Sequence, residues 1–553
     1  MFKKNDSHGQ LGLFDVTDQL SPHQQNLLST SLEGRFYDEI FCKIDESRFG
    51  VLYSSIKSRP NVAVNQLVGA LILKHLYNWT YEQLFLQLNF NLLTRWALGI
   101  RSLETAIFCP SSIFNFQRRL FEHYVQSGQH LIEEVFDQLT AAQLKSLGIK
   151  SSIQRCDSFQ AGSNIFAYPR LQLLIEVLLR LSRQLDKPAL AACEELLAPY
   201  LGQTSGQYTF RLSKEEIQAE LGKIGQVYHQ LYQQLKPAYE HHQIFVLFCR
   251  VYQEHFVFED QQIILIPSKE LATSTLLSPD DPEATYRKKA GKDHKGYVTH
   301  ICETAHPDNE LNLITDVATH PNNTDDGAIL AQQAPSMLTK TPDLEELHTD
   351  GGYPSPAVDE LLVPAGVTLF ATNQRGRKAR VVFKEELQPP LKPGEVETYL
   401  ITCPRGQAVS INPSGEKKAA TAYFDAKICQ SCPFLRKCST KEHKKKNLRS
   451  RYYEYVDFLR IKRRERAKKV PKERKKLRAN VEASVRQMKR GIKNGKLRVR
   501  GFIQAQTYAF FTAISVNFKR IHHEKERKRG KESLPKAKKD MILTPYAYWQ
   551  QAA

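Results

Sequence analysis

Apolar side chains recur at intervals of three and four residues in three parts of the chain, and this spacing predicts α-helices. In the first part, Leu67, Ala70 and Leu71 share one side of a helix expected over 65–77. The three parts are 21–119, 171–260 and 452–493, the last continued by an apolar helix over 502–518.

Polar residues at the helix starts refine this pattern in the first part. Thr80 followed by Gln83 forms a capping box. Ser111 or Ser112 is expected to cap a further helix over 113–124. Several short helices with tight connections are typical of a helix-turn-helix DNA-binding region. A helical packing domain explains the same pattern equally well, so the pattern leaves both open.

Strand patterns lie between the helical parts. The alternation in 149–159 predicts a strand with Asp157 near its end. A second carboxylate, Asp350, follows the short run 344–347 and precedes two glycines, which predicts a strand that ends at a sharp turn. The remaining expected core elements are a hairpin of 296–303 and 311–318, helices over 326–338 and 354–362, and a strand over 367–371.

The element order predicts an α/β fold, a mixed sheet flanked by helices and interrupted by insertions. The chain is too long for one compact core. The expected division is a flexible arm (1–20), a helical N-terminal domain (21–145), a first core part (146–170), a mainly helical insertion (171–285), a second core part (286–374), a Cys-rich insertion (375–450), a last core part with a basic helix (451–525) and a basic tail (526–553).

The charge of the chain narrows the classes of partner. A net charge of +19 on 553 residues points to polyanions, either nucleic acid or an anionic membrane face. About two-fifths of residues 441–500 are Lys or Arg. The longest apolar stretches are too short to span a bilayer, and the N-terminus lacks the apolar core of a signal peptide. Ten cysteines in a chain of this length do not indicate a secreted disulfide scaffold, so a cytoplasmic location is expected.

Carboxylates on separate strands are the ligands that divalent cations take. Asp157 and Asp350 form such a pair, and phosphodiester cleavage by two metal ions normally needs a third carboxylate. We expect Glu482 to be that residue, because it lies beside the apolar stripe of its helix and so at the edge of the buried face. Glu465 and Glu473 are rivals without an apolar flank. The plainer interpretation is that Glu482 only pairs with the arginines four residues to either side.

Three motifs in this order resemble those of the DDE transposases of bacterial insertion sequences. They are Asp157-Ser158, Asp350-Gly351-Gly352-Tyr353, and Arg478-x-x-x-Glu482 with Lys489. The helical region 55–125, including the run from Ser112 to Leu120, is similar to the N-terminal domain common in that group. The family often has a tyrosine three residues before the arginine, where this chain has Lys475, so no aromatic role is expected there.

The resemblance implies an RNase H-like core in which Asp157, Asp350 and Glu482 hold two Mg²⁺ ions, with Mn²⁺ as an alternative ion. Water attacks at the transposon end, and the freed 3′-hydroxyl then attacks target DNA. Asn164 is a further candidate for orienting the substrate. The expected DNA-contacting residues are Arg478, Arg486, Lys489, Arg118 and Arg119.

Four cysteines form a second cluster in the basic segment before the glutamate helix. They are Cys403, Cys429, Cys432 and Cys438. A Cys-x-x-Cys pair with two further cysteines predicts a structural Zn²⁺ site. A redox-active pair is the rival interpretation, but no βαβ pattern surrounds it. The other cysteines mostly fall in apolar surroundings and are expected to be buried thiols.

The sequence therefore predicts a DNA transposase with a helical DNA-binding N-terminal domain, an RNase H-like mixed sheet flanked by helices, a helical insertion and a zinc-bearing insertion. Its expected partners are the double-stranded terminal inverted repeats of the transposon and target DNA, with a homodimer on paired ends. No membrane partner is expected, and the expected location is the bacterial cytoplasm with the nucleoid. The alternative is a non-catalytic zinc-containing DNA-binding protein derived from a transposase.

Overall fold

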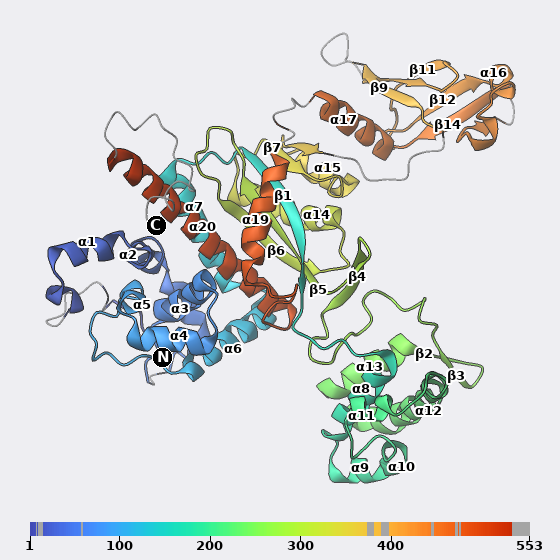
Figure 1. Ribbon diagram of the computed structural model, residues 1–553. Helices are drawn as coiled ribbons and strands as arrows, with labels where there is room; N and C mark the ends of the chain where they lie inside the picture. The colour runs from blue at the N-terminus through green and yellow to red at the C-terminus, as the bar shows by residue number, and fades with distance from the viewer. Residues whose placement is uncertain are drawn as a thin grey trace, which may run out of the picture.

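A mixed β-sheet lies at the centre of the computed structural model (Figure 1). The structure describes residues 1–6, 8, 15–56, 59–372, 381–388, 397–443, 447–469, 474 and 477–533. The strand order is β4-β5-β1-β7-β8, and β6 also pairs with β5. The strands are β1 (Ile153–Gly162), β4 (Thr285–Lys289), β5 (Lys292–Thr304), β6 (Ile314–Pro321), β7 (Glu346–Thr349) and β8 (Thr368–Ala371).

Strand directions make the sheet mixed. β1 runs parallel to β7, and β7 runs parallel to β8. β5 runs antiparallel to β1, β4 and β6, so the predicted hairpin of β5 and β6 is confirmed. Parallel strands need crossover connections, which here contain α14 (Asp326–Lys340) and α15 (Pro356–Leu362).

The two faces of the sheet pack against different helices. Because side chains alternate along a strand, Tyr297 and Ile301 of β5 enter a large core shared with the N-terminal helices and α20 (Phe502–Ser533). Cys302, on the other face, packs with Cys156 against α14 and α15. The sheet is therefore buried on both faces.

The N-terminal domain is joined to the sheet by α20, which crosses the molecule diagonally between them (Figure 1). The ring of Phe36 contacts that of Phe518 edge to face, and Phe510 lies against His130 and Phe136. The domain therefore packs into the core. Its helices are η2 (Val16–Gln19), α1 (Pro22–Thr30), α2 (Leu32–Glu39), η3 (Phe41–Lys43), η4 (Glu46–Leu52), α3 (Val64–Tyr77), α4 (Tyr81–Phe90), α5 (Leu92–Ala97), α6 (Pro110–Ser127) and α7 (Leu131–Leu147).

Two details of this region differ from the expectation. Helix α6 begins at Pro110 with Cys109 as its N-cap, so neither Ser111 nor Ser112 is the cap. Proline is favoured in the first turn because its missing N–H is not needed there. Residues 1–6, expected to be a flexible arm, instead lie against the domain, where the backbone N–H of Asn5 donates to the carboxylate of Glu46 (2.9 Å).

The expected helical insertion leaves the sheet after β1 and projects from it (Figure 1). Its helices enclose a core of their own around Tyr228 and Phe248, whose rings stack. Its elements are α8 (Arg170–Ser182), α9 (Lys187–Ala192), α10 (Glu194–Leu197), α11 (Ser205–Phe210), α12 (Lys214–Tyr239), α13 (Gln243–His255), β2 (Phe256–Glu259) and β3 (Gln262–Leu265).

The Cys-bearing segment forms small sheets beside α17, and Arg463 of α17 pairs with Asp359 of α15. The helix expected over 452–493 is not continuous. Strand β14 continues to Tyr453, α17 begins at Tyr455, and the 3-10 helix η6 precedes α19, which begins at Val481. Glu473 and Lys475 lie outside the described residues. The elements are β9 (Lys384–Gln388), β10 (Thr398–Thr402), β11 (Ala408–Ile411), β12 (Ala420–Asp425), α16 (Ala426–Gln430), η5 (Leu435–Lys437), β13 (Lys441–Glu442), β14 (Leu448–Tyr453), α17 (Tyr455–Lys469), η6 (Arg478–Asn480), α19 (Val481–Met488) and η7 (Lys489–Gly491).

Among the helices of the described ranges, none has both the length and the apolar character needed to cross a membrane.

Candidate active site

Asp157 and Asp350 come together where β7 separates from β1. Asp157 lies in the middle of β1, not near its end as expected, because antiparallel pairing with β5 extends β1 to Gly162. The parallel pairing with β7 reaches only Arg155, and β7 itself ends at Thr349, one residue before Asp350. Ligands of α/β sheets bind at such carboxyl ends of parallel strands.

The turn after β7 fixes the carboxylate of Asp350. Its Oδ1 accepts a hydrogen bond from the backbone N–H of Gly352 (2.7 Å). The next residue, Tyr353, is buried, and its hydroxyl lies 3.1 Å from Nδ1 of His300 on β5. The aspartate is thus held between its own backbone turn and an aromatic anchor in the core.

The electrostatics of Asp157 show which groups face it. Burial raises the pKa of Asp157, and the negative charge of Asp350 raises it further. The guanidinium of Arg478 and the backbone N–H of Ser158 act in the opposite direction. The two aspartates therefore lie within electrostatic range of each other.

Arg478 connects the first aspartate to the glutamate helix. Its Nη2 lies 2.9 Å from Oδ2 of Asp157, and its Nη1 lies 3.6 Å from Oε1 of Glu482. One guanidinium thus lies between carboxylates 325 positions apart in the chain. Arg478, expected to contact DNA, is here an internal counter-ion of the carboxylates.

Glu482 does not lie at the edge of the buried face, and that expectation is wrong. Its side chain is 71% exposed. Helix α19 buries Val481, Ser484 and Met488 instead, because the hydroxyl of Ser484 donates a hydrogen bond to a buried carboxylate. This turns Glu482 towards solvent, where a substrate can reach it.

The other residues predicted to contact DNA divide into two groups. Lys489 faces the carboxylates: burial lowers its pKa, the charge of Asp157 opposes that shift, and Nζ lies 5.4 Å from the ring centre of Phe159. Arg486 is exposed on the same helix. Arg118 and Arg119 lie on α6 in the N-terminal domain.

The two α6 arginines differ in their surroundings. Arg118 is 66% exposed beside Glu122, with 3.8 Å between the charged atoms. The guanidinium of Arg119 lies 4.9 Å from the ring centre of Tyr53. Asn164 is exposed at the end of β1, where its backbone N–H donates to the carbonyl of Val499.

Glu303 on β5 is the buried carboxylate that holds α19, and the sequence patterns did not identify it. It is fully buried and pairs with Arg155 on β1 (2.6 Å) and Arg520 on α20 (2.9 Å). The hydroxyl of Ser484 donates to it, and Arg155 also donates to the carbonyl of Leu477 just before the glutamate helix. The available signal was a Glu at the end of an expected apolar strand.

Asp326, at the start of α14, is a second buried carboxylate that the patterns missed. Its Oδ1 accepts a hydrogen bond from the hydroxyl of Ser158 (2.7 Å), the residue after Asp157. It supports the strand position beside the first aspartate. Two consecutive acids before an apolar helix were the available signal, and helix capping explains that pattern equally well.

The four cysteines predicted to bind zinc line one cavity of ≈ 20 Å³. Burial raises the pKa of the Cys429 thiol, and Cys403 and Cys438 raise it further, so these thiols lie near each other. The amide N–H of Cys432 donates to the carbonyl of Cys429 (3.0 Å), which closes a tight turn.

No group of three or more His, Cys, Asp or Glu side chains in the described part of the chain has a geometry that could hold a metal ion. The guanidinium of Arg478 lies between the carboxylates of Asp157 and Glu482, two of the three predicted metal ligands. A cation that binds there must therefore displace this side chain.

Two family models match the chain. "Transposase DDE domain" matches residues 402–522, which include the cysteine cluster and Glu482. "Transposase domain (DUF772)" matches residues 25–119 in the N-terminal helical domain. No curated protein and no solved structure matched the chain.

The Glu303 network predicts the behaviour of α19. Glu303→Gln leaves Arg155 and Arg520 buried without their shared anion, a change that costs about 3–5 kcal/mol. We expect hydrogen–deuterium exchange in peptides covering α19 to accelerate by about a hundredfold or more. Glu442→Gln is the matched control, because Glu442 is 83% exposed in its pair with Arg449 and such pairs contribute less than about 1 kcal/mol. Equal exchange in both variants would contradict the role of Glu303.

Proposed function

The two matches indicate an insertion-sequence transposase of the DDE type, and from that premise we propose that Asp157, Asp350 and Glu482 form its catalytic centre. The reaction is metal-dependent cleavage of DNA at transposon ends, followed by transfer of the freed 3′ end into target DNA. One observation carries the proposal. Arg478 contacts both Asp157 and Glu482, and the charge of Asp350 acts on Asp157.

The arrangement of the sheet supports an RNase H-like core. β1, which carries the first aspartate, lies between antiparallel β5 and parallel β7, which leads to the second. The third carboxylate lies on a helix that packs against β1 through the Glu303 network. Two strands and one helix thus each position one of the three carboxylates.

The donor set fits a hard divalent cation. Carboxylate oxygens are the ligands that Mg²⁺ prefers, and Mn²⁺ accepts the same ligands. Asp157, Asp350 and Glu482 would hold the ions. When bound, they would activate the attacking oxygen and stabilise the leaving oxygen.

The protein's own groups prepare the site for DNA. Burial raises the pKa of Asp157, and a nearby positive charge acts in the opposite direction. Arg478 supplies that charge in the free protein. Once cations take its place, its guanidinium is free to bind a backbone phosphate beside Lys489 and Arg486. Arg118 is the exposed candidate for DNA contact in the N-terminal domain, and pairing of two transposon ends favours a homodimer on DNA.

A structural Zn²⁺ in the cysteine segment is a separate part of the proposal. Its support is that Cys403, Cys429, Cys432 and Cys438 line one small cavity in a segment with a modest core. Tetrahedral thiolate ligation suits Zn²⁺. Binding requires the thiols to lose their protons and draw together around the ion.

Substitution of the carboxylates tests the proposed chemistry. Asp157→Asn, Asp350→Asn and Glu482→Gln are each expected to lower Mg²⁺-dependent nicking of DNA with the element's terminal repeats by about a hundredfold or more, because metal-ion catalysis contributes several kcal/mol. DNA binding should persist. The control is Glu465→Gln, on α17.

Two results would contradict this assignment. Nicking that survives Asp350→Asn excludes the proposed centre. An unaltered chain that binds terminal-repeat DNA but never nicks it in Mg²⁺ or Mn²⁺ favours the non-catalytic DNA-binding alternative.

Metal analysis tests the zinc proposal. The purified full chain is expected to contain about one zinc, and Cys432→Ser should reduce that content and loosen the segment to proteolysis. The control, Cys42→Ser, changes an exposed cysteine outside the cluster and should leave the zinc content unchanged. An unaltered chain purified without zinc would refute the site.

A further inference from the structure

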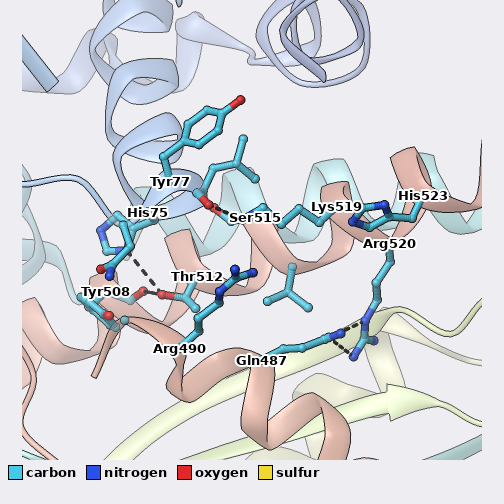
Figure 2. A pocket seen from close by; sticks show the side chains of 14 residues that line it. His75, Tyr77, Gln487, Arg490, Tyr508, Thr512, Ser515, Lys519, Arg520 and His523 are labelled. Atoms are coloured by element: carbon cyan, nitrogen blue, oxygen red, sulfur yellow. Dashed lines mark hydrogen bonds between the residues drawn. The ribbon is translucent and has the colours of Figure 1, made fainter. Parts of the chain in front are cut away.

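Two adjoining cavities open where the N-terminal domain meets α20. The first, of ≈ 250 Å³, lies between the end of α3, the η7 turn and α20 (Figure 2). The second, of ≈ 210 Å³, lies between the start of α4, Arg498 and α20. The two cavities lie side by side, because His75 and Tyr508, whose rings pack edge to face (4.7 Å), line both, and together they are called the recess.

The lining of this recess is strongly basic. Four cations line it, and no carboxylate does. Within the described residues none of the four forms an ion pair. A fifth cation, Arg520, is excluded from this set because it forms an ion pair with Glu303. The four are Lys74, Arg490, Arg498 and Lys519.

The contacts that hold these cations do not neutralise them. Lys519 donates to the carbonyl of Leu76, and Nη1 of Arg498 lies 3.4 Å from the carbonyl of Asn78. Nζ of Lys74 lies 4.5 Å from the ring centre of Tyr81. Burial lowers the pKa of Lys74 to about 8, and the charge of Arg498 adds to that shift. An anion in the recess would relieve this repulsion.

The recess is tied to the catalytic helix. Arg490 follows Glu482 by eight residues, past the end of α19 at Met488 and into the η7 turn, so a rise of about 1.5–2 Å per residue separates them by roughly 12–13 Å along the axis. A Cβ at Gly491 would lie 2.2 Å from the hydroxyl oxygen of Tyr508, so this glycine lets the η7 turn pack directly on α20. The turn that carries Arg490 is therefore packed directly against α20.

We propose that this recess binds consecutive backbone phosphates of the DNA strand that enters the carboxylate site. Phosphates of one strand are spaced about 3.4 Å along the duplex axis, so the recess lies three to four nucleotides from the cut. Each cavity is smaller than the roughly 300 Å³ of a small-molecule pocket, which favours phosphate groups over a whole nucleotide. The inference rests on the proposed function for the identity of the polyanion and for the position of the cut.

The test compares two double variants of the full chain. Arg490→Gln/Arg498→Gln removes two recess cations. Arg183→Gln/Arg211→Gln is the matched control, because both arginines are exposed on the helical insertion. The measurement is the affinity for duplex DNA as a function of salt, with inorganic phosphate binding followed by ³¹P NMR. The recess variant should lower the slope of log K against log salt by about 1.8, or 0.9 per lost phosphate contact, and the control should not.

Two outcomes of this comparison would overturn the inference. An unchanged slope with lost phosphate binding would assign the recess to a free anion and not to DNA. Equal slopes and equal phosphate binding in the two variants would remove the anion site altogether. Cleavage is measured separately, in the unaltered chain and in Asp350→Asn. An unaltered chain that binds DNA through the recess but does not nick it contradicts the proposed function and leaves the inference about the recess intact.

Discussion

The buried carboxylate of Glu303 is the constraint on which the geometry of the site depends. It pairs with Arg155 from the strand of Asp157 and with Arg520 from α20, and it accepts a hydrogen bond from Ser484 on the helix of Glu482. Removing one partner of a buried ion pair is costly, so these elements are expected to hold or release one another together. Helix α19 is short and exposes the side chain of Glu482, and the hydrogen bond from Ser484 to Glu303 holds the helix in position.

The position of the Arg478 side chain follows from that geometry. Once α19 lies against β1, the turn before it places one guanidinium between Asp157 and Glu482. Like charges gathered in a partly buried site repel, and the guanidinium reduces that repulsion. In the proposed function, the same positive charge would compete with a metal ion and would suit a DNA phosphate. In the proposed account, the guanidinium of Arg478 therefore leaves the carboxylates when cations bind, and it then binds a DNA phosphate.

The sequence predicted the elements of the core well, because their patterns are local. The strand before Asp350, the hairpin of β5 and β6 and the helix over 65–77 all depend on periodicity and turn residues. The exposure of Glu482 was predicted wrongly, because its helix is turned by the long-range bond from Ser484 to Glu303. No local pattern records that bond.

The resemblance of motifs led to the prediction of Asp157, Asp350 and Glu482, but it did not indicate the residues that support them. Glu303 and Asp326 look like ordinary strand and helix-start acids in the sequence, and their roles depend on residues far along the chain. The basic recess was missed for the same reason. Lys74 lies in the helix expected over 65–77, which was predicted from its apolar positions alone, and Arg490 and Arg498 lie in the general basic run 441–500.

Mn²⁺ binding to the full chain, followed by electron paramagnetic resonance, tests the central claim most directly. If the three carboxylates form one cation site with Arg478 as competitor, Asp350→Asn and Glu482→Gln should each weaken Mn²⁺ binding by about tenfold or more, the equivalent of 1.4 kcal/mol per lost ligand. Arg478→Gln should tighten it in the absence of DNA. Mn²⁺ affinity that is the same in Asp350→Asn, Glu482→Gln and the unaltered chain would contradict the account.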